Sequence, residues 1–204
     1  EDADQRYIES VLESSGFPME DVEIVSYPGC SQIEAAIVLG SFLREKAPHI
    51  TLIVHRDRDY LPDDEIDKFT QRLKEKSIIP FVTVGNDIES YFTKAEHLAA
   101  ANPPLSVVRA QELLDQAVEA TSEKSKRAII NLRTGQAFRE RNRGGSSPDH
   151  GQIALDAVKD FESSPHTMAR GDLVLGSLTA LLQQEIGQNP QILRMTSHLD
   201  VPEL

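Results

Sequence analysis

The stretch Ile50-Thr51-Leu52-Ile53-Val54-His55-Arg56-Asp57-Arg58-Asp59 decides the expected fold. Its first five residues are nearly all apolar, which is typical of a central parallel strand covered on both faces. A helix is expected before it, from Ser31 as a capping residue to about Lys46, and the acidic turn at 62–65 opens another helix after it. The sequence therefore predicts a strand that lies between two helices along the chain.

The same alternation continues on both sides of this unit. We expect a helix over 4–14, a strand over 22–27 and a further strand over 78–84, in which Pro80 indicates an edge position or a strand start. Three helix–strand repeats predict an α/β domain with a mainly parallel sheet. Right-handed crossovers would bring the ends of the strands, and any ligand, to one edge of the sheet.

The second half of the chain has a helical pattern instead. Pro103-Pro104 marks a boundary, and helices are expected over 105–143, about 151–162 and 172–186, with a loop over 144–148. We therefore predict two domains: an α/β domain over 1–103 and a helical extension over 104–204.

Composition is that of an ordinary soluble globular chain, with 39% hydrophobic and 26% charged residues. The formal net charge of −12 argues against attraction of polyanions by the chain as a whole. Its 204 residues contain no apolar run long enough to span a membrane, no recognisable signal peptide and one cysteine, Cys30. These features predict a protein of the reducing cytoplasm.

The charge is unevenly distributed, because residues 124–143 carry seven basic residues and one acid. This basic segment, with a net charge of +6, is the predicted contact to a nucleic-acid backbone. The alternatives are a long solvated helix or a surface packed against an acidic partner. The basic residues are Lys124, Lys126, Arg127, Arg133, Arg139, Arg141 and Arg143.

Asp57 and Asp59 are the sharpest chemical feature of the sequence. Two residues apart in extended chain, they would face the same way, and two carboxylates at a strand end suit a hard cation such as Mg²⁺. Arg56 and Arg58 alternate with them and could contact a phosphate. The alternative is a solvated turn in which the arginines neutralise the acids.

A third acid, Glu89, follows the next predicted strand. It lies in the stretch Asp87-Ile88-Glu89-Ser90-Tyr91-Phe92, where Asp87 is the expected N-cap of a short helix. Glu89 could point back toward the strand ends, or it could be an exposed residue stabilised by the helix dipole.

The two acidic stretches together resemble the TOPRIM nuclease domain of the OLD family, over residues 1–92. That family has an acid after its first strand, an Asp-x-Asp after its third, and an acid-Ile-Glu-(Asn/Ser)-Tyr element after the next. Glu1-Asp2-Ala3-Asp4 matches the first motif imperfectly, since Asp2 stands where the family has glycine. The family's later Gly-Lys corresponds to Arg170-Gly171 here.

The resemblance implies a TOPRIM-like fold and a metal-dependent endonuclease. Glu1, Asp57, Asp59 and Glu89 would bind Mg²⁺ or Mn²⁺, and Arg170 would take the position of the catalytic lysine, although arginine cannot act as a neutral base. The implied partners are DNA or RNA and an ATPase domain or subunit, as in phage-defence systems, and a homodimer is possible. No Walker A pattern occurs in the sequence.

Two other functions remain open at this point. The first is a catalytically decayed TOPRIM interaction module, which the changes at Asp2 and Arg170 would suit. The second is a metal-dependent nucleotide-sugar glycosyltransferase that uses Asp57 and Asp59 together with the acidic helix start at 63–65.

Overall fold

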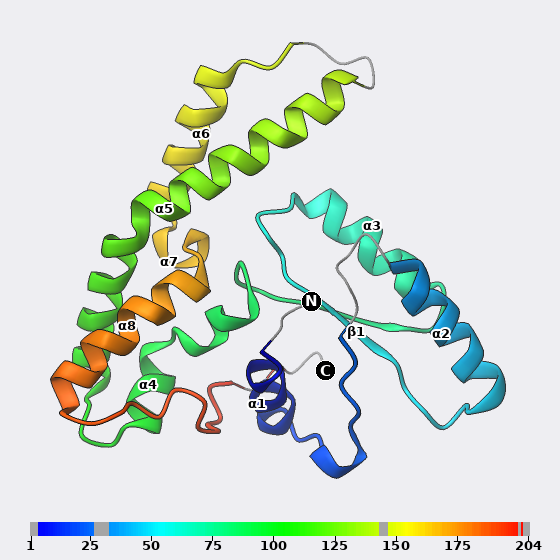
Figure 1. The fold of residues 1–204 in the computed structure, drawn as a ribbon, viewed down its shortest axis with the longest axis horizontal. Helices are drawn as coiled ribbons and strands as arrows, with labels where there is room; N and C mark the ends of the chain where they lie inside the picture. The colour runs from blue at the N-terminus through cyan, green and yellow to red at the C-terminus, as the bar shows by residue number, and fades with distance from the viewer. Residues whose placement is uncertain (1–3, 27–32, 143–146, 200, 202–204) are drawn as a thin grey trace. The chain divides into compact units, whose positions relative to one another are not determined.

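The computed structural model describes residues 4–26, 33–142, 147–199 and 201 (Figure 1). Its contacts divide the chain into two compact units. Unit 1 contains the described residues up to Ile88 together with Val201, and unit 2 runs from Glu89 to Leu199. This division falls at Ile88, whereas the sequence predicted a domain boundary at residue 103. The mixed α/β class is confirmed, with helix predominating in the described residues.

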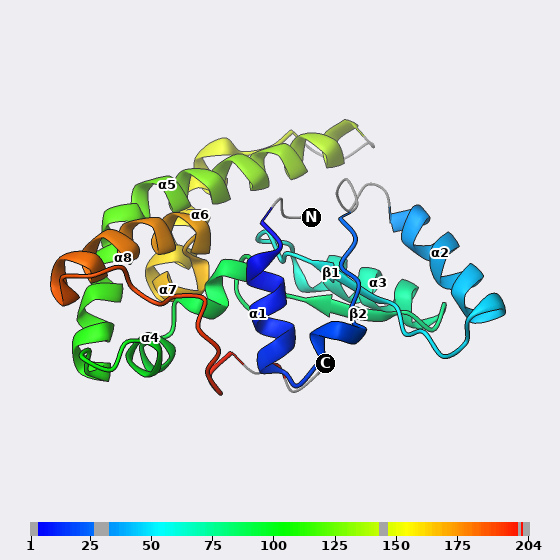
Figure 2. The ribbon, with the colours of Figure 1, turned by 60° about the horizontal axis from the view of Figure 1, so that its bottom comes forward.

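Unit 1 combines three α-helices with a small parallel sheet. Strands β1 and β2 pair in parallel, with Ile53 opposite Ile79 and Arg56 opposite Val82 (Figure 2). Helix α3 connects the two strands, as a crossover between parallel strands requires. In chain order the elements are α1 (Arg6–Ser14), η1 (Met19–Asp21), α2 (Ile33–Lys46), β1 (Ile53–Arg56), α3 (Asp63–Lys74) and β2 (Ile79–Val82).

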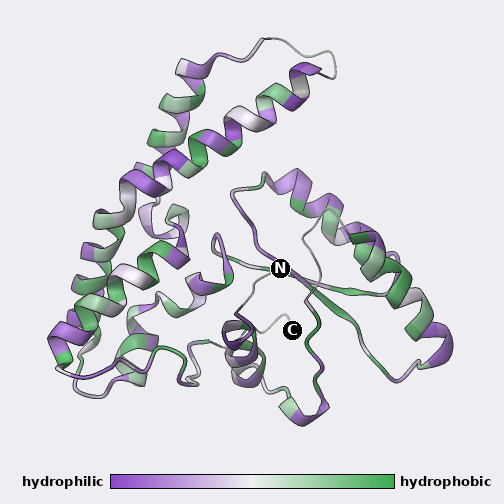
Figure 3. Ribbon diagram, viewed as in Figure 1, coloured by the Kyte–Doolittle hydropathy of each residue, from purple (hydrophilic) through white to green (hydrophobic). Residues whose placement is uncertain are grey.

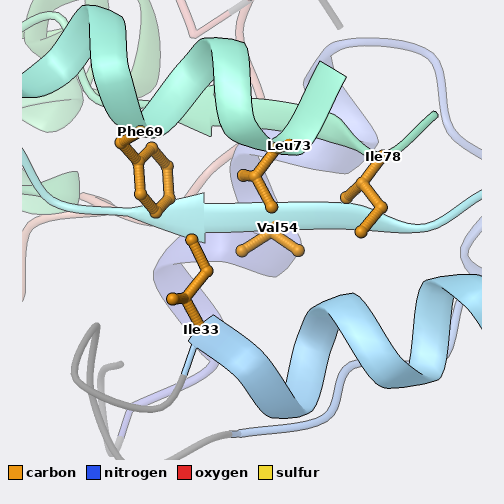
Figure 4. Close-up of a cluster of buried hydrophobic side chains, with 5 residues drawn as sticks. All are labelled: Ile33, Val54, Phe69, Leu73 and Ile78. Atoms are coloured by element: carbon orange, nitrogen blue, oxygen red, sulfur yellow. The ribbon is translucent and has the colours of Figure 1, made fainter. Parts of the chain in front are cut away.

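The core of unit 1 gathers apolar side chains from both flanking helices around β1. Figure 4 shows Val54 of β1 with Ile33 of α2 and with Phe69 and Leu73 of α3, and Ile78 completes the cluster. Burial of these side chains removes apolar surface from water and stabilises the packing of α2 and α3 against β1.

Two strand predictions differ from the structure. The predicted strand over 50–54 begins instead at Ile53 and continues through Arg56, with Val54 buried and the other three residues half-buried. Residues 22–26 of the predicted strand over 22–27 form no strand, and Tyr27 lies outside the described residues. A run of β-forming residues needs a pairing partner to become a strand, and propensity alone does not provide one.

Unit 2 is built around one long helix, α5, which packs against α4, α6, α7 and α8 (Figure 1). Apolar side chains buried on α5 recur at helical spacing, at Ala110, Leu113, Leu114, Ala117 and Val118. In Figure 3 the ribbon of α5 alternates between hydrophilic and hydrophobic colours along its length. The elements are η3 (Ile88–Phe92, from Glu89 onward in this unit), α4 (Ala95–Ala101), α5 (Val107–Asn142), α6 (His150–Ser163), α7 (Pro165–Met168) and α8 (Gly171–Ile186).

The three predicted helices of the second half are confirmed to within two residues at either end by α5, α6 and α8. Gly187 follows α8 with a φ of +67°, a left-handed conformation that glycine adopts without strain. None of the described helices has the length and apolarity needed to cross a membrane.

A completely buried histidine joins α4 to the chain that follows α8. The Nε2 atom of His97 lies 2.8 Å from the carbonyl oxygen of Ile192, and its Nδ1 atom lies 2.9 Å from the Thr196 hydroxyl. Because a carbonyl only accepts, Nε2 carries the proton and Nδ1 accepts from Thr196. Burial lowers the pKa of the His97 imidazole, and the hydrogen bond to the Ile192 carbonyl offsets part of this effect.

We expect acid to destabilise unit 2 through His97. The unfolded imidazole has a pKa of about 6.5, so the unfolded state binds the proton more readily than the folded state. The stabilising contribution is complete above that pH and is lost as the pH falls below it, by up to about 1.4 kcal/mol per pH unit. Urea unfolding at a series of pH values measures the effect.

The variant His97→Gln should show a shallower fall in unfolding free energy between pH 7 and pH 5 than the wild type. The matched control His49→Gln changes an exposed histidine and should keep the wild-type slope. Equal slopes for all three proteins would contradict the assignment to His97.

Candidate active site in unit 1

Two loops meet where the parallel strands of unit 1 end. The first, residues 57–60, follows β1, and the second, residues 83–87, follows β2. The backbone N–H of Arg58 donates to the Thr83 hydroxyl at 3.0 Å, and the N–H of Asp59 donates to the carbonyl of Asn86 at 2.9 Å. The Thr83 N–H donates in turn to the carbonyl of Arg56 at 3.2 Å. Two hydrogen bonds therefore join the two loops, and a third holds Thr83 to the last residue of β1.

Asp57 is buried at this junction, with 7% of its surface exposed. The residues on either side of it, Arg56 and Arg58, are both held to Thr83 through their backbones. The position of Asp57 is thereby determined by the end of the sheet. Burial of a carboxylate is costly unless a partner compensates, so a buried acid at a strand end is a candidate functional group.

Asp59 and Tyr60 adopt the left-handed conformation, with φ values of 49° and 57°. This conformation costs a residue with a side chain about 1–2 kcal/mol, and such residues cluster at functional sites. The prediction that Asp57 and Asp59 face the same way assumed an extended chain, and the structure has a turn there instead. Asp59 is exposed, whereas Asp57 is buried.

His55, the third residue of β1, accompanies Asp57. Its Nε2 atom lies 3.5 Å from Oδ1 of Asp57, and its ring packs against Phe81 with centroids 5.1 Å apart. Burial lowers the pKa of His55 to about 4. At neutral pH the imidazole ring is therefore uncharged.

The 83–87 loop contributes buried polar residues that the sequence analysis did not single out. Thr83 accepts the Arg58 N–H and donates its hydroxyl proton to the carbonyl of Gly85 at 3.0 Å. Asn86 is 5% exposed, and within the described part of the chain its Oδ1 atom is buried with no hydrogen-bond partner. The only available signal was a polar Gly-Asn turn directly after a predicted strand.

Two further metal ligands were predicted, Glu1 and Glu89. Glu1 lies outside the described residues, and Glu89 is a half-buried residue of η3 at the start of unit 2. Over 4–26, 33–142, 147–199 and 201, no three His, Cys, Asp or Glu side chains form a group that could hold a metal ion.

The oxygen donors of unit 1 nevertheless suit Mg²⁺. This ion usually binds one or two carboxylates and completes its shell with water and substrate phosphates. Asp57 and Asp59 supply carboxylates, and Asn86 has an amide oxygen without a partner in the described residues. All of these are hard oxygen ligands, which Mg²⁺ and Mn²⁺ prefer.

The arginines predicted to contact phosphate have contacts within the chain. The Arg56 guanidinium lies 5.0 Å from the centre of the Phe69 ring, and Arg58 forms an ion pair with Asp63. In unit 2, Arg170 precedes α8 and binds Asp172 through two hydrogen bonds of 3.0 and 2.6 Å. A phosphate would have to compete with the carboxylate partners of Arg58 and Arg170.

The basic segment of α5 is divided between paired and exposed cations. The Nζ atom of Lys126 lies 3.6 Å from Oε1 of Glu162, and the Nη2 atom of Arg133 lies 2.7 Å from Oδ2 of Asp160. Both residues therefore pair with acids of α6. Ion pairs within the chain thus occupy two of the seven basic residues. The exposed residues are Lys124, Arg127, Arg139 and Arg141, and Arg143 lies outside the described residues.

No protein-family model matches the chain, and no curated protein or solved structure matches it. The resemblance to TOPRIM domains therefore rests on the sequence motifs, and the candidate site rests on those motifs and on the geometry of unit 1.

Proposed function

We propose that this chain is a Mg²⁺- or Mn²⁺-dependent nuclease that hydrolyses phosphodiester bonds in DNA or RNA. The observation that carries the proposal is the buried carboxylate of Asp57, at the carboxyl end of a parallel strand. Ligand sites of open parallel α/β sheets lie outside this end of the strands. The hydrogen bonds between the 57–60 and 83–87 loops support the proposal, because a catalytic group must be held in place.

In this proposal Asp57 and Asp59 of unit 1 hold the divalent ion, and the roles of Glu1 and Glu89 derive from the motif resemblance alone. A bound ion would activate water and stabilise charge on the attacking and leaving oxygens of the phosphodiester. The TOPRIM-like arrangement, the role of Arg170 and the coupling to an ATPase in phage defence belong to the same proposal. They derive from the motif resemblance.

The proposal is tested by incubating the purified chain with single- and double-stranded DNA and RNA. We expect cleavage with Mn²⁺ or Mg²⁺ and none with EDTA. Metal binding without cleavage of any substrate, also with a cognate ATPase added, would contradict the nuclease and favour an interaction module. Binding of a UDP-sugar would favour a glycosyltransferase.

A separate prediction concerns the exposed cations of α5. Nucleic-acid affinity falls with salt at a slope of about 0.9 per phosphate contacted in duplex DNA. If Lys124 and Arg127 each contact a phosphate, the variant with both changed to alanine should lose about two units of that slope. Titration of labelled DNA by fluorescence anisotropy at several salt concentrations measures it.

Two controls accompany this measurement. Lys126→Ala should reduce the slope by less, because Lys126 already pairs with Glu162. Lys74→Ala, on α3 of unit 1, should leave it unchanged. An unchanged slope in the double variant would exclude these two cations from the backbone contact.

A further inference from the structure

We propose that the side-chain amide oxygen of Asn86 is a further ligand for the divalent ion, a role that rests on the nuclease proposal above. Asn86 is almost completely buried, yet its Oδ1 atom has no hydrogen-bond partner in the described residues. Buried polar atoms are nearly always paired, because leaving one unpaired forfeits its interaction with water. An unpaired buried acceptor in a folded chain calls for an explanation, such as a bound ion or an ordered water.

The backbone places Asn86 beside the acidic loop. Its carbonyl accepts the N–H of Asp59 at 2.9 Å, and three residues earlier Thr83 accepts the N–H of Arg58. Residues 57–59 and Asn86 are therefore neighbours across the tied loops, although 27 positions separate Asn86 from Asp59 in the sequence. All of them belong to unit 1.

The chemistry of the amide suits the same cation. An amide oxygen is a hard, neutral ligand of the kind that Mg²⁺ and Mn²⁺ accept beside carboxylates. A neutral ligand adds coordination without adding to the repulsion between Asp57 and Asp59. An ordered water molecule could also satisfy the oxygen, and the experiment below separates the two possibilities.

The test is isothermal titration of the full chain with Mn²⁺ alone, combined with thermal unfolding of the metal-free proteins. Asn86→Leu should raise the Kd for Mn²⁺ about tenfold or more, by analogy with the loss of groups that only support a metal ligand. Its metal-free melting temperature should stay equal or rise, because the substitution removes a buried acceptor without a partner.

Asn86→Asp provides the opposite change at the same position. A carboxylate there should lower the Kd for Mn²⁺ and lower the metal-free melting temperature, since it places an uncompensated negative charge at a buried position. The control Asn131→Leu, on the exposed side of α5, should leave the Kd unchanged. If Asn86→Leu does not fold, the affinity of Asn86→Asp for Mn²⁺ tests the proposal in its place.

The outcomes distinguish this inference from the nuclease proposal. The role of Asn86 alone would be overturned if Asp57→Asn abolishes Mn²⁺ binding while Asn86→Leu keeps the wild-type Kd. It would be overturned equally if Asn86→Asp does not lower the Kd. Failure of the wild-type chain to bind Mn²⁺ at millimolar concentration would overturn both.

Discussion

Replacing Asp57 by asparagine is expected to reduce metal-dependent phosphodiester cleavage by more than about a hundredfold, since loss of residues that merely support a metal ligand already costs 10–100-fold. The substitution keeps the size of the buried side chain and removes its charge. The reaction depends on that charge in our proposal, because Asp57 is the buried carboxylate at the end of β1. Initial cleavage rates with saturating Mn²⁺ measure the effect.

Metal-induced stabilisation gives a second measurement for the same variant. A ligand at a hundred times its Kd stabilises the folded state by about 2.7 kcal/mol. The wild-type chain should therefore melt at a higher temperature with Mn²⁺ than without it, and Asp57→Asn should lose most of this difference.

The matched control is Asp67→Asn, which changes an exposed acid on α3. It should keep both the cleavage rate and the metal-dependent shift in melting temperature. Cleavage by Asp57→Asn at the wild-type rate would contradict the assignment of the active site.

The second large effect concerns the core of unit 1. Leu73→Ala should lower the unfolding free energy by about 2.7–5 kcal/mol, the range observed when buried leucines are truncated. Leu73 is completely buried in the cluster with Val54, Phe69 and Ile78, so its removal leaves a cavity between α3 and its neighbours. Urea unfolding followed by circular dichroism measures the loss.

Leu39→Ala is the control for this prediction, because it makes the same chemical change on α2 at a side chain that is 42% exposed. It should cost much less than Leu73→Ala. Similar losses in the two variants would show that Leu73 does not pack as the structure places it.

The helices were predictable because their signals are local. The pattern over 105–143 predicted α5 (Val107–Asn142), and the acidic start at 62–65 preceded α3 (Asp63–Lys74). Apolar spacing and helix-capping residues act within a few turns, so a single sequence contains them. Strands depend on a distant partner, and for this reason residues 22–26 looked like a strand and did not form one.

The candidate site was predictable in part for the same reason. Asp57 and Asp59 were found because they follow an apolar run directly. Thr83 and Asn86 were missed because their importance comes from hydrogen bonds to Arg58 and Asp59, which are remote along the chain. No local pattern marks a residue whose role is to hold another loop.

The role of Gly40 becomes visible only in the tertiary structure. In the sequence it is a helix-weakening glycine without a motif. In unit 1 a Cβ atom at this position would lie 2.7 Å from Cδ1 of Ile78, so the absent side chain permits the close approach of α2 to the residue before β2.

By itself the sequence determined where the longer helices lie and which carboxylates follow a strand, since both depend on neighbouring residues. The short helices α4 and α7 were not predicted. Only the tertiary structure decided that Asp57 is buried while Asp59 is exposed in a left-handed turn. It likewise decided that Lys126 and Arg133 pair with α6, which leaves Lys124 and Arg127 exposed within the basic segment. Burial and ion pairing depend on residues brought together from distant parts of the chain, and local patterns do not encode those distances.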